Sequence, residues 1–191
     1  MLKMNYWTDK WDLHEDICPC DVHFNDWVED RKLRGNSIYH FGTGTHHVIG
    51  IRQAENGSGN VVFAITASIE EYEAYLRLVT DKSAVSKNYL AYFGDIYLTN
   101  PKLLPEFDVV TLFHLCEFFF PNTASKEYGG MTDRAVLDLL TDKTRPDGHI
   151  LFYTRSIAFE KAKAVIAEWE KAKPVERVGE FKTLLIYRKT G

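Results

Sequence analysis

Short apolar runs alternate along this chain with stretches in which apolar residues recur at steps of three and four. The short runs, rich in β-branched and aromatic residues, predict buried strands; they span residues 38–41, 61–66, 89–93, 108–114, 149–153, 175–178 and 183–187. The periodic stretches predict amphipathic helices; the clearest span residues 69–79, 135–140 and 159–169. Strands that alternate with helices predict an α/β fold with a mostly parallel sheet of seven strands between two helical layers.

The ends of the chain refine this picture. The last two strands flank Gly179 and Glu180, which predicts a tight turn and one antiparallel edge strand. A further turn is expected at 146–148, where a Pro-Asp-Gly sequence leads into the fifth strand. Pro19 is well placed to start a helix that ends near Gly35. We therefore expect residues 1–35 to form a helical cap and residues 36–191 to form the α/β domain.

A glycine-containing turn follows the first expected strand. Gly42 and Gly44 stand between the apolar run that ends at Phe41 and a stretch able to start a helix. Glycine lets the backbone bend sharply and lets a ligand approach without a Cβ in the way. Unpaired N–H groups at the helix start favour a negatively charged or carbonyl-rich ligand. On its own this turn is a weak signal, and an ordinary strand-to-helix turn is the favoured interpretation until other parts of the chain agree.

Composition narrows the classes of function. The chain has 191 residues, of which 45% are hydrophobic and 26% charged, with a formal net charge of −4. This balance gives no electrostatic argument for binding nucleic acid or an anionic membrane. Three cysteines do not form a disulfide framework, and no apolar run has the length of a signal peptide or membrane span. We expect a cytoplasmic protein whose oligomeric state the sequence leaves open.

The order of motifs over residues 36–191 resembles the class I S-adenosylmethionine-dependent methyltransferases. The resemblance rests on short matches in the family's order, which run His40-Phe-Gly-Thr-Gly-Thr-His46, Ala64-Ile-Thr-Ala-Ser68, Gly94-Asp-Ile96, Phe107-Asp-Val-Val-Thr-Leu-Phe-His-Leu-Cys-Glu117 and Arg145-Pro-Asp-Gly-His-Ile-Leu151. It implies a Rossmann-like fold over residues 36–191, S-adenosylmethionine as the cofactor and methyl transfer. The small cap favours a small-molecule acceptor, and the charge balance favours no nucleic-acid or membrane partner.

The resemblance also implies roles for individual residues. Gly42, Thr43 and Gly44 would hold the methionine part of the cofactor. Thr66 would face the ribose, and Asp95 with Ile96 would face the adenine, although a plain turn residue explains Asp95 equally. His114, at the carboxyl end of the fourth strand near Glu117, is the candidate catalytic base or a side chain that only shapes the site.

Three positions depart from the family pattern. His40 replaces the acid of the glycine turn, His46 its third glycine, and Thr66 the ribose-binding acid. Glu70 could lean back to supply a carboxylate, although the sequence does not show this. We expect the His46 ring to point away from the site or to flank the cofactor carboxylate as a donor. These changes leave open a second interpretation, a binding or structural protein that has lost donor binding.

Other cofactors receive less support. The turn lacks a third glycine at dinucleotide spacing and an acid at the second strand, which argues against a nicotinamide cofactor. The side chains of His14, Cys18, Cys20 and His23 are able to bind zinc, but Cys-x-Cys is short for one tetrahedral site. We expect no metal and an unmetallated loop there. Aromatic rings at Tyr6, Trp7 and Trp11 would either face the cofactor or pack as a lid without touching it.

Overall fold

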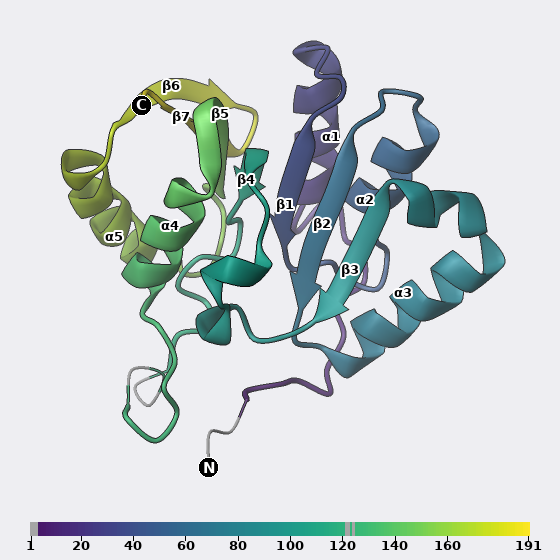
Figure 1. Ribbon diagram of the computed structural model, residues 1–191, viewed down its shortest axis with the longest axis horizontal. Helices are drawn as coiled ribbons and strands as arrows, with labels where there is room; N and C mark the ends of the chain where they lie inside the picture. The colour runs from purple at the N-terminus through teal and green to yellow at the C-terminus, as the bar shows by residue number, and fades with distance from the viewer. Residues whose placement is uncertain (1–3, 121–122, 124) are drawn as a thin grey trace.

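The computed structural model describes residues 4–120, 123 and 125–191 and contains one seven-stranded sheet with the order β3-β2-β1-β4-β5-β7-β6 (Figure 1). The strands are β1 Ser37–Phe41, β2 Val61–Thr66, β3 Tyr89–Phe93, β4 Phe107–Thr111, β5 Thr144–Tyr153, β6 Val175–Phe181 and β7 Leu184–Lys189. Strands β1 to β5 pair in parallel, and β7 runs antiparallel between β5 and β6. The predicted α/β sheet with an antiparallel edge is confirmed.

Strand order places a crevice where the chain reverses direction across the sheet. From β1 the chain moves outward through β2 to β3, and then returns to β4 on the other side of β1. In open α/β sheets the loops after such neighbouring strands separate to opposite faces and leave a ligand crevice at the carboxyl ends. The carboxyl ends of β1, β2 and β4 are therefore where a ligand site is expected.

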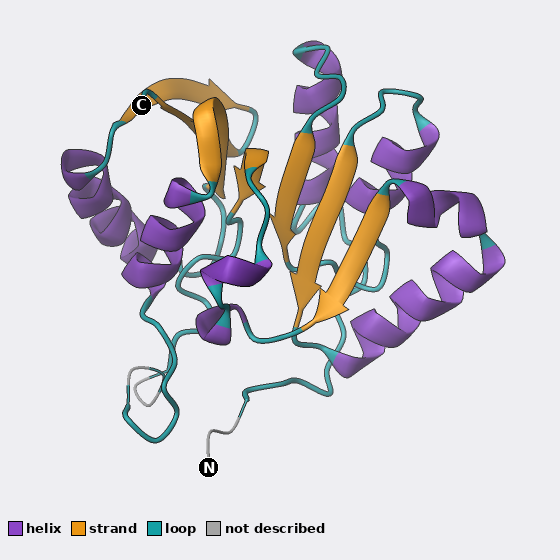
Figure 2. Cartoon of the chain, viewed as in Figure 1, coloured by secondary structure: helices purple, strands orange, loops and turns teal. Residues whose placement is uncertain are grey.

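Helices cover both faces of the sheet, which gives the predicted three layers (Figure 2). Their bounds are α1 Cys20–Asp30, α2 Val48–Glu55, α3 Ile69–Asp81, α4 Asp133–Asp142 and α5 Phe159–Ala172. Strand side chains alternate between the faces, so Ile38 packs on the α1, α2 and α3 side while Tyr39 packs on the α4 and α5 side. Among the described residues, no helix is both long and apolar enough to cross a membrane.

Helix α1 belongs to one of these layers. Its Phe24 is fully buried and meets Phe113, and its Trp27 meets His149 of β5. The helix ends at Asp30, earlier than the sequence predicted, and Lys32 just beyond it adopts a left-handed φ of 54°. The expected domain boundary at residue 35 stays a prediction.

Two turns differ from their expected form. The sequence predicted a tight turn at Gly179, but β6 continues through it to Phe181. Gly179 has a φ of +143° where the pairing with β7 shifts register, so it forms a bulge, and the chain reverses at Lys182 instead. The Pro-Asp-Gly sequence expected before the fifth strand lies inside β5, where the pairing with β4 is interrupted between Phe107 and Val109.

Candidate functional site

A cavity of about 220 Å³ lies at the carboxyl ends of β1, β2 and β4. Most of the residues that the sequence proposed for cofactor binding and catalysis line it: Gly42, Gly44, Thr66, Asp95, Ile96 and His114. The remaining one, Thr43, is buried and donates a hydrogen bond to the cavity-lining Glu71. The fold therefore brings together residues that are separated by up to about seventy positions in the chain.

The glycine turn adopts backbone angles that need glycine. Gly42 has a φ of +85° and Gly44 a φ of +56°, in the left-handed region that L side chains rarely adopt. A Cβ on Gly42 would lie 3.6 Å from Cδ2 of His114 across the cavity. The turn thus places the carboxyl end of β1 directly beside the His114 ring.

The His46 ring folds back over this turn. A Cβ on Gly44 would lie 2.3 Å from His46 Nε2, and the ring lines the cavity with only 18% of its side chain exposed. Its Nδ1 accepts a 3.3 Å hydrogen bond from Val48 N–H, so Nε2 carries the proton and faces Asp21 Oδ2 at 3.8 Å. Of the two placements expected from the sequence, pointing away from the site is wrong, because the ring lines the cavity, whereas flanking the cofactor carboxylate as a donor stays a prediction.

A buried carboxylate stands beside the position of the missing ribose-binding acid. Glu71 of α3 is 3% exposed, and its Oε2 accepts from the hydroxyl of Thr66 at 2.6 Å and from that of Thr43 at 3.0 Å. Its Oε1 accepts no hydrogen bond from the described part of the chain, which leaves it for a ligand. Burial raises the pKa of Glu71, although both threonine hydroxyls act against this rise.

Asp95 is also buried at the cavity wall. Its carboxylate accepts hydrogen bonds from the Tyr97 N–H at 2.9 Å, from the Asn5 N–H at 3.1 Å and from the Tyr128 hydroxyl. Burial raises the pKa of Asp95, and the two backbone bonds oppose the rise. These contacts fix the carboxylate in place, which suits both interpretations of Asp95 that the sequence offered.

His114 follows β4, and the carboxylate of Glu117 orients its ring through Nδ1. Its Nδ1 lies 3.0 Å from Oε1 of Glu117, which in turn accepts a 2.6 Å hydrogen bond from the Ser156 hydroxyl. Burial opposes protonation of the ring, but the hydrogen bond to Glu117 and the charges of Glu117, Cys18 and Asp21 together raise the pKa of His114. Because a carboxylate only accepts, Nδ1 carries a proton and Nε2 faces the cavity as the reactive atom.

Two cysteines face His114 across the cavity. Cys18 Sγ lies 3.5 Å from Cys20 Sγ, and this hydrogen bond lowers the pKa of Cys18 to about 6 and raises that of Cys20. Asp21 beside them is fully enclosed, and burial raises its pKa to about 7. His23, which the sequence grouped with these cysteines, pairs instead with the Thr183 hydroxyl at 2.8 Å.

His40 takes no direct part in lining the cavity. Its Nδ1 lies 2.8 Å from the Thr111 hydroxyl, while Nε2 is buried without a hydrogen-bond partner among the described residues and stands 3.9 Å from Asp21 Oδ2. Burial lowers the pKa of His40 to about 3, so the ring is neutral at physiological pH. A neutral, buried ring that does not line the cavity therefore stands where the family pattern has an acid.

The N-terminal segment closes one side of the cavity. Trp7 exchanges backbone hydrogen bonds with Ala67 and Ile69 at the end of β2, which anchors the segment across the strand ends. Trp7 and Trp11 line the cavity, and their rings meet Phe118 edge to face at 5.1 and 6.0 Å. Tyr6, in contrast, is 54% exposed. The segment acts as a wall made of two tryptophans.

No protein-family model matches the sequence, and no curated protein matches it significantly. Solved structures do match: a methyltransferase from Pyrococcus furiosus has a TM-score of 0.61 at 18% identity, covering 100% of this chain and 90% of that protein. The cyclase SpnF has a TM-score of 0.62 at 13% identity, with coverages of 100% and 87%. The chain thus has the class I S-adenosylmethionine-dependent methyltransferase fold.

A larger enzyme gives a partial match. Coclaurine N-methyltransferase, bound to N-methylheliamine and SAH, has a TM-score of 0.50 at 16% identity. The match covers 69% of this chain and 35% of that protein, so this chain spans about a third of its length. Because the fold also includes a protein named as a cyclase, fold alone does not fix the reaction.

Some site residues were missed by the sequence. The sequence suggested Glu70, not its neighbour Glu71, as the carboxylate beside Thr66. However, Ser68 and Glu71 have the Ser-x-x-Glu spacing of a helix start. That spacing places residue 71 in the first turn, next to Thr66, while Glu70 is exposed. No local signal could link Cys18 and Cys20 to His114, because that contact exists only in the folded chain.

Proposed function

We propose that this protein binds S-adenosylmethionine in the cavity at the carboxyl ends of β1, β2 and β4 and transfers its methyl group to a small-molecule acceptor. The observation that carries the proposal is the Glu71 carboxylate, which lies beside Thr66 at the end of β2 and lines the cavity. A carboxylate with a free oxygen can accept from both ribose hydroxyls, as the acid at the end of the second strand does in the resembling family.

The other proposed contacts follow the order of the strands. The turn of Gly42 and Gly44, beside Thr43, would hold the methionine end, and Asp95 with Ile96 would meet the adenine. Methyl transfer works largely by holding the two reactants in line and excluding water. The wall formed by Trp7 and Trp11 supports such exclusion, and tryptophan rings favour a neighbouring cation such as the donor's sulfonium.

His114 is the proposed base. Its Nε2 faces the cavity, and Glu117 stabilises the ring when it takes up a proton at that atom. An acceptor hydroxyl, amine or thiol would lose its proton to Nε2 as its lone pair attacks the methyl carbon and the bond from that carbon to sulfur breaks. The products are the methylated acceptor, the demethylated thioether and a protonated His114.

A rival function is supported by the ring of His46. It lies over Gly44 inside the cavity, where a donor's carboxylate would come close, and it favours a protein that has kept the fold but lost the donor. Isothermal titration calorimetry with S-adenosylmethionine and with S-adenosylhomocysteine separates the two. Heat of binding for either supports the proposal, and no heat for both at millimolar concentrations rejects it.

A further inference from the structure

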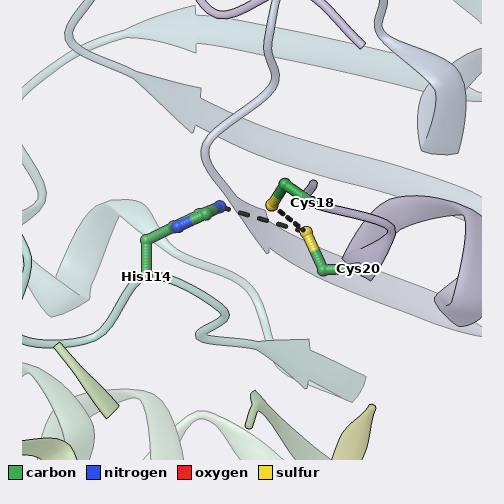
Figure 3. Close-up of side chains that lie close together, drawn as sticks. All are labelled: Cys18, Cys20 and His114. Carbon is green, nitrogen blue, oxygen red and sulfur yellow. Dashed lines mark hydrogen bonds between the residues drawn. The ribbon is translucent and has the colours of Figure 1, made fainter. Parts of the chain in front are cut away.

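Three atoms that can bind a metal ion converge on one side of the cavity. Cys18 Sγ and Cys20 Sγ lie 3.5 Å apart, Cys20 Sγ lies 4.0 Å from His114 Nε2, and all three atoms lie within 4.8 Å of one another. Figure 3 shows the His114 ring pointing its nitrogen toward the two sulfur atoms. The cysteines flank Pro19 before α1, and the histidine follows β4.

These separations match those of a tetrahedral zinc site before the ion is present. With Zn–S bonds of about 2.3 Å and Zn–N bonds of about 2.05 Å, ligand sulfurs stand about 3.8 Å apart and sulfur and nitrogen about 3.6 Å apart. The observed 3.5 and 4.0 Å differ from these by about half an ångström or less, and the third pair of ligand atoms lies within 4.8 Å. Small side-chain rotations would therefore be enough to bind the ion.

His114 is prepared to act as a ligand through Nε2. Its Nδ1–H faces Glu117 Oε1 at 3.0 Å, so the lone pair of Nε2 is directed at the sulfurs. A carboxylate behind a histidine is the arrangement that orients zinc-binding histidines and raises their basicity. Glu117 Oε1 itself accepts a 2.6 Å hydrogen bond from the Ser156 hydroxyl, and this bond orients the carboxylate against the His114 ring.

We propose that Cys18, Cys20 and His114 bind one zinc ion. Two thiolates and an imidazole favour Zn²⁺ over the hard ions Mg²⁺ and Ca²⁺. Three protein ligands leave a fourth position, and because all three residues line the cavity, that position faces the cavity contents. Sites of this type, with one exchangeable position, lower the pKa of the group bound there.

The zinc site does not depend on the proposed methyl transfer, because it is defined by protein ligands alone. It does change one role: with zinc bound, Nε2 is coordinated and His114 no longer acts as a base. A hydroxyl or thiol of the acceptor at the fourth position would then lose its proton to solvent on binding zinc. A thiol fits best, since zinc binds thiolates readily.

The first experiment measures zinc in the purified chain, without any methyl donor, by mass spectrometry of the metal after dialysis against zinc-free buffer. We expect about one zinc per chain, and a loss of most of it in Cys18→Ser, Cys20→Ser and His114→Gln. Cys116→Ser and His23→Gln are the matched controls, because Cys116 is buried elsewhere and His23 pairs with Thr183. Both controls should keep the wild-type zinc content.

A second measurement does not depend on how well the variants fold. Cobalt added to the metal-free wild-type chain should give thiolate-to-cobalt charge-transfer bands, which zinc then removes. Absence of both zinc and these bands, with Cys18 and Cys20 found as free thiols or as a disulfide, overturns the proposal. Zinc that survives His114→Gln but is lost in His23→Gln also overturns it, in favour of the site grouped from the sequence.

Discussion

The carboxylate of Glu71 accepts a 2.6 Å hydrogen bond from the hydroxyl of Thr66, five residues earlier in the chain. Thr66 ends β2 and Glu71 lies in the first turn of α3, so a single strand-to-helix connection creates the pair. The Thr66 hydroxyl also accepts from the N–H of Ser68, which orients its proton toward Glu71. A carboxylate therefore lies beside the position where Thr66 departs from the family pattern, on the helix and not on the strand.

Replacing Glu71 by glutamine tests this carboxylate. Glu71→Gln keeps the shape and one oxygen acceptor but loses the charge that strengthens bonds to the ribose hydroxyls. We expect the affinity for S-adenosylmethionine to fall by roughly 1–3 kcal/mol, or about five- to 150-fold. Calorimetry measures it, with Glu70→Gln as the matched control on the exposed side of the same helix turn. Equal affinities for the two variants would remove Glu71 from the site.

Placing the acid of the family pattern at residue 66 should weaken binding of the methyl donor. The change Thr66→Asp removes the donor to Glu71 and places two carboxylates side by side, where like charges repel. We expect donor affinity to fall by at least about tenfold, which is 1.4 kcal/mol. The double variant Thr66→Asp with Glu71→Gln should recover most of that loss. A single variant that binds the donor more tightly would contradict this arrangement.

His46→Gly shows whether the ring over Gly44 blocks the cavity. The ring is held by one long hydrogen bond of 3.3 Å, so it can turn aside when a ligand enters. We therefore expect donor affinity to change by less than about tenfold, or roughly 1.4 kcal/mol. Parallel titrations of the two proteins measure it. A much larger gain in affinity would mean that the native ring excludes the donor, and the rival function would then be favoured.

His47 makes the stability of the fold depend on acid pH. Its Nε2–H donates to the Glu71 carbonyl at 2.9 Å and its Nδ1 accepts from the Tyr89 hydroxyl at 2.7 Å, so the buried ring is fully paired while neutral. Burial lowers its pKa from 6.5 to about 4. Because the unfolded chain takes up the proton first, stability is retained above pH 6.5 and falls as the pH drops toward 4.

The titration of His47 lowers the free energy of unfolding by on the order of 3 kcal/mol at pH 4 and below. His47→Asn, a residue that tolerates the left-handed φ of 46° found there, removes the titrating ring. Urea unfolding between pH 4 and 7 should then show a flatter pH dependence than in the wild type, with His14→Asn as the exposed control. Identical pH dependence in the wild type and His47→Asn would contradict the prediction.

The sequence by itself determined the architecture. Strands such as Val61–Thr66 and Tyr89–Phe93 have the predicted bounds, because their buried apolar runs are closed by clear turn residues. It also placed Gly42, Gly44 and His114 at one cavity, since parallel strands in a known order bring their carboxyl ends together. Local patterns fix such features because each depends on residues close along the chain.

Only the tertiary structure decided which side chains meet inside that cavity. It brought Glu71 of α3 into the same cavity as His114, which follows β4. It paired Cys20 with His114, which are 94 residues apart and have no shared pattern in the sequence. Periodicity reports which face of an element is buried, whereas the partner across a cavity depends on the packing of separate elements.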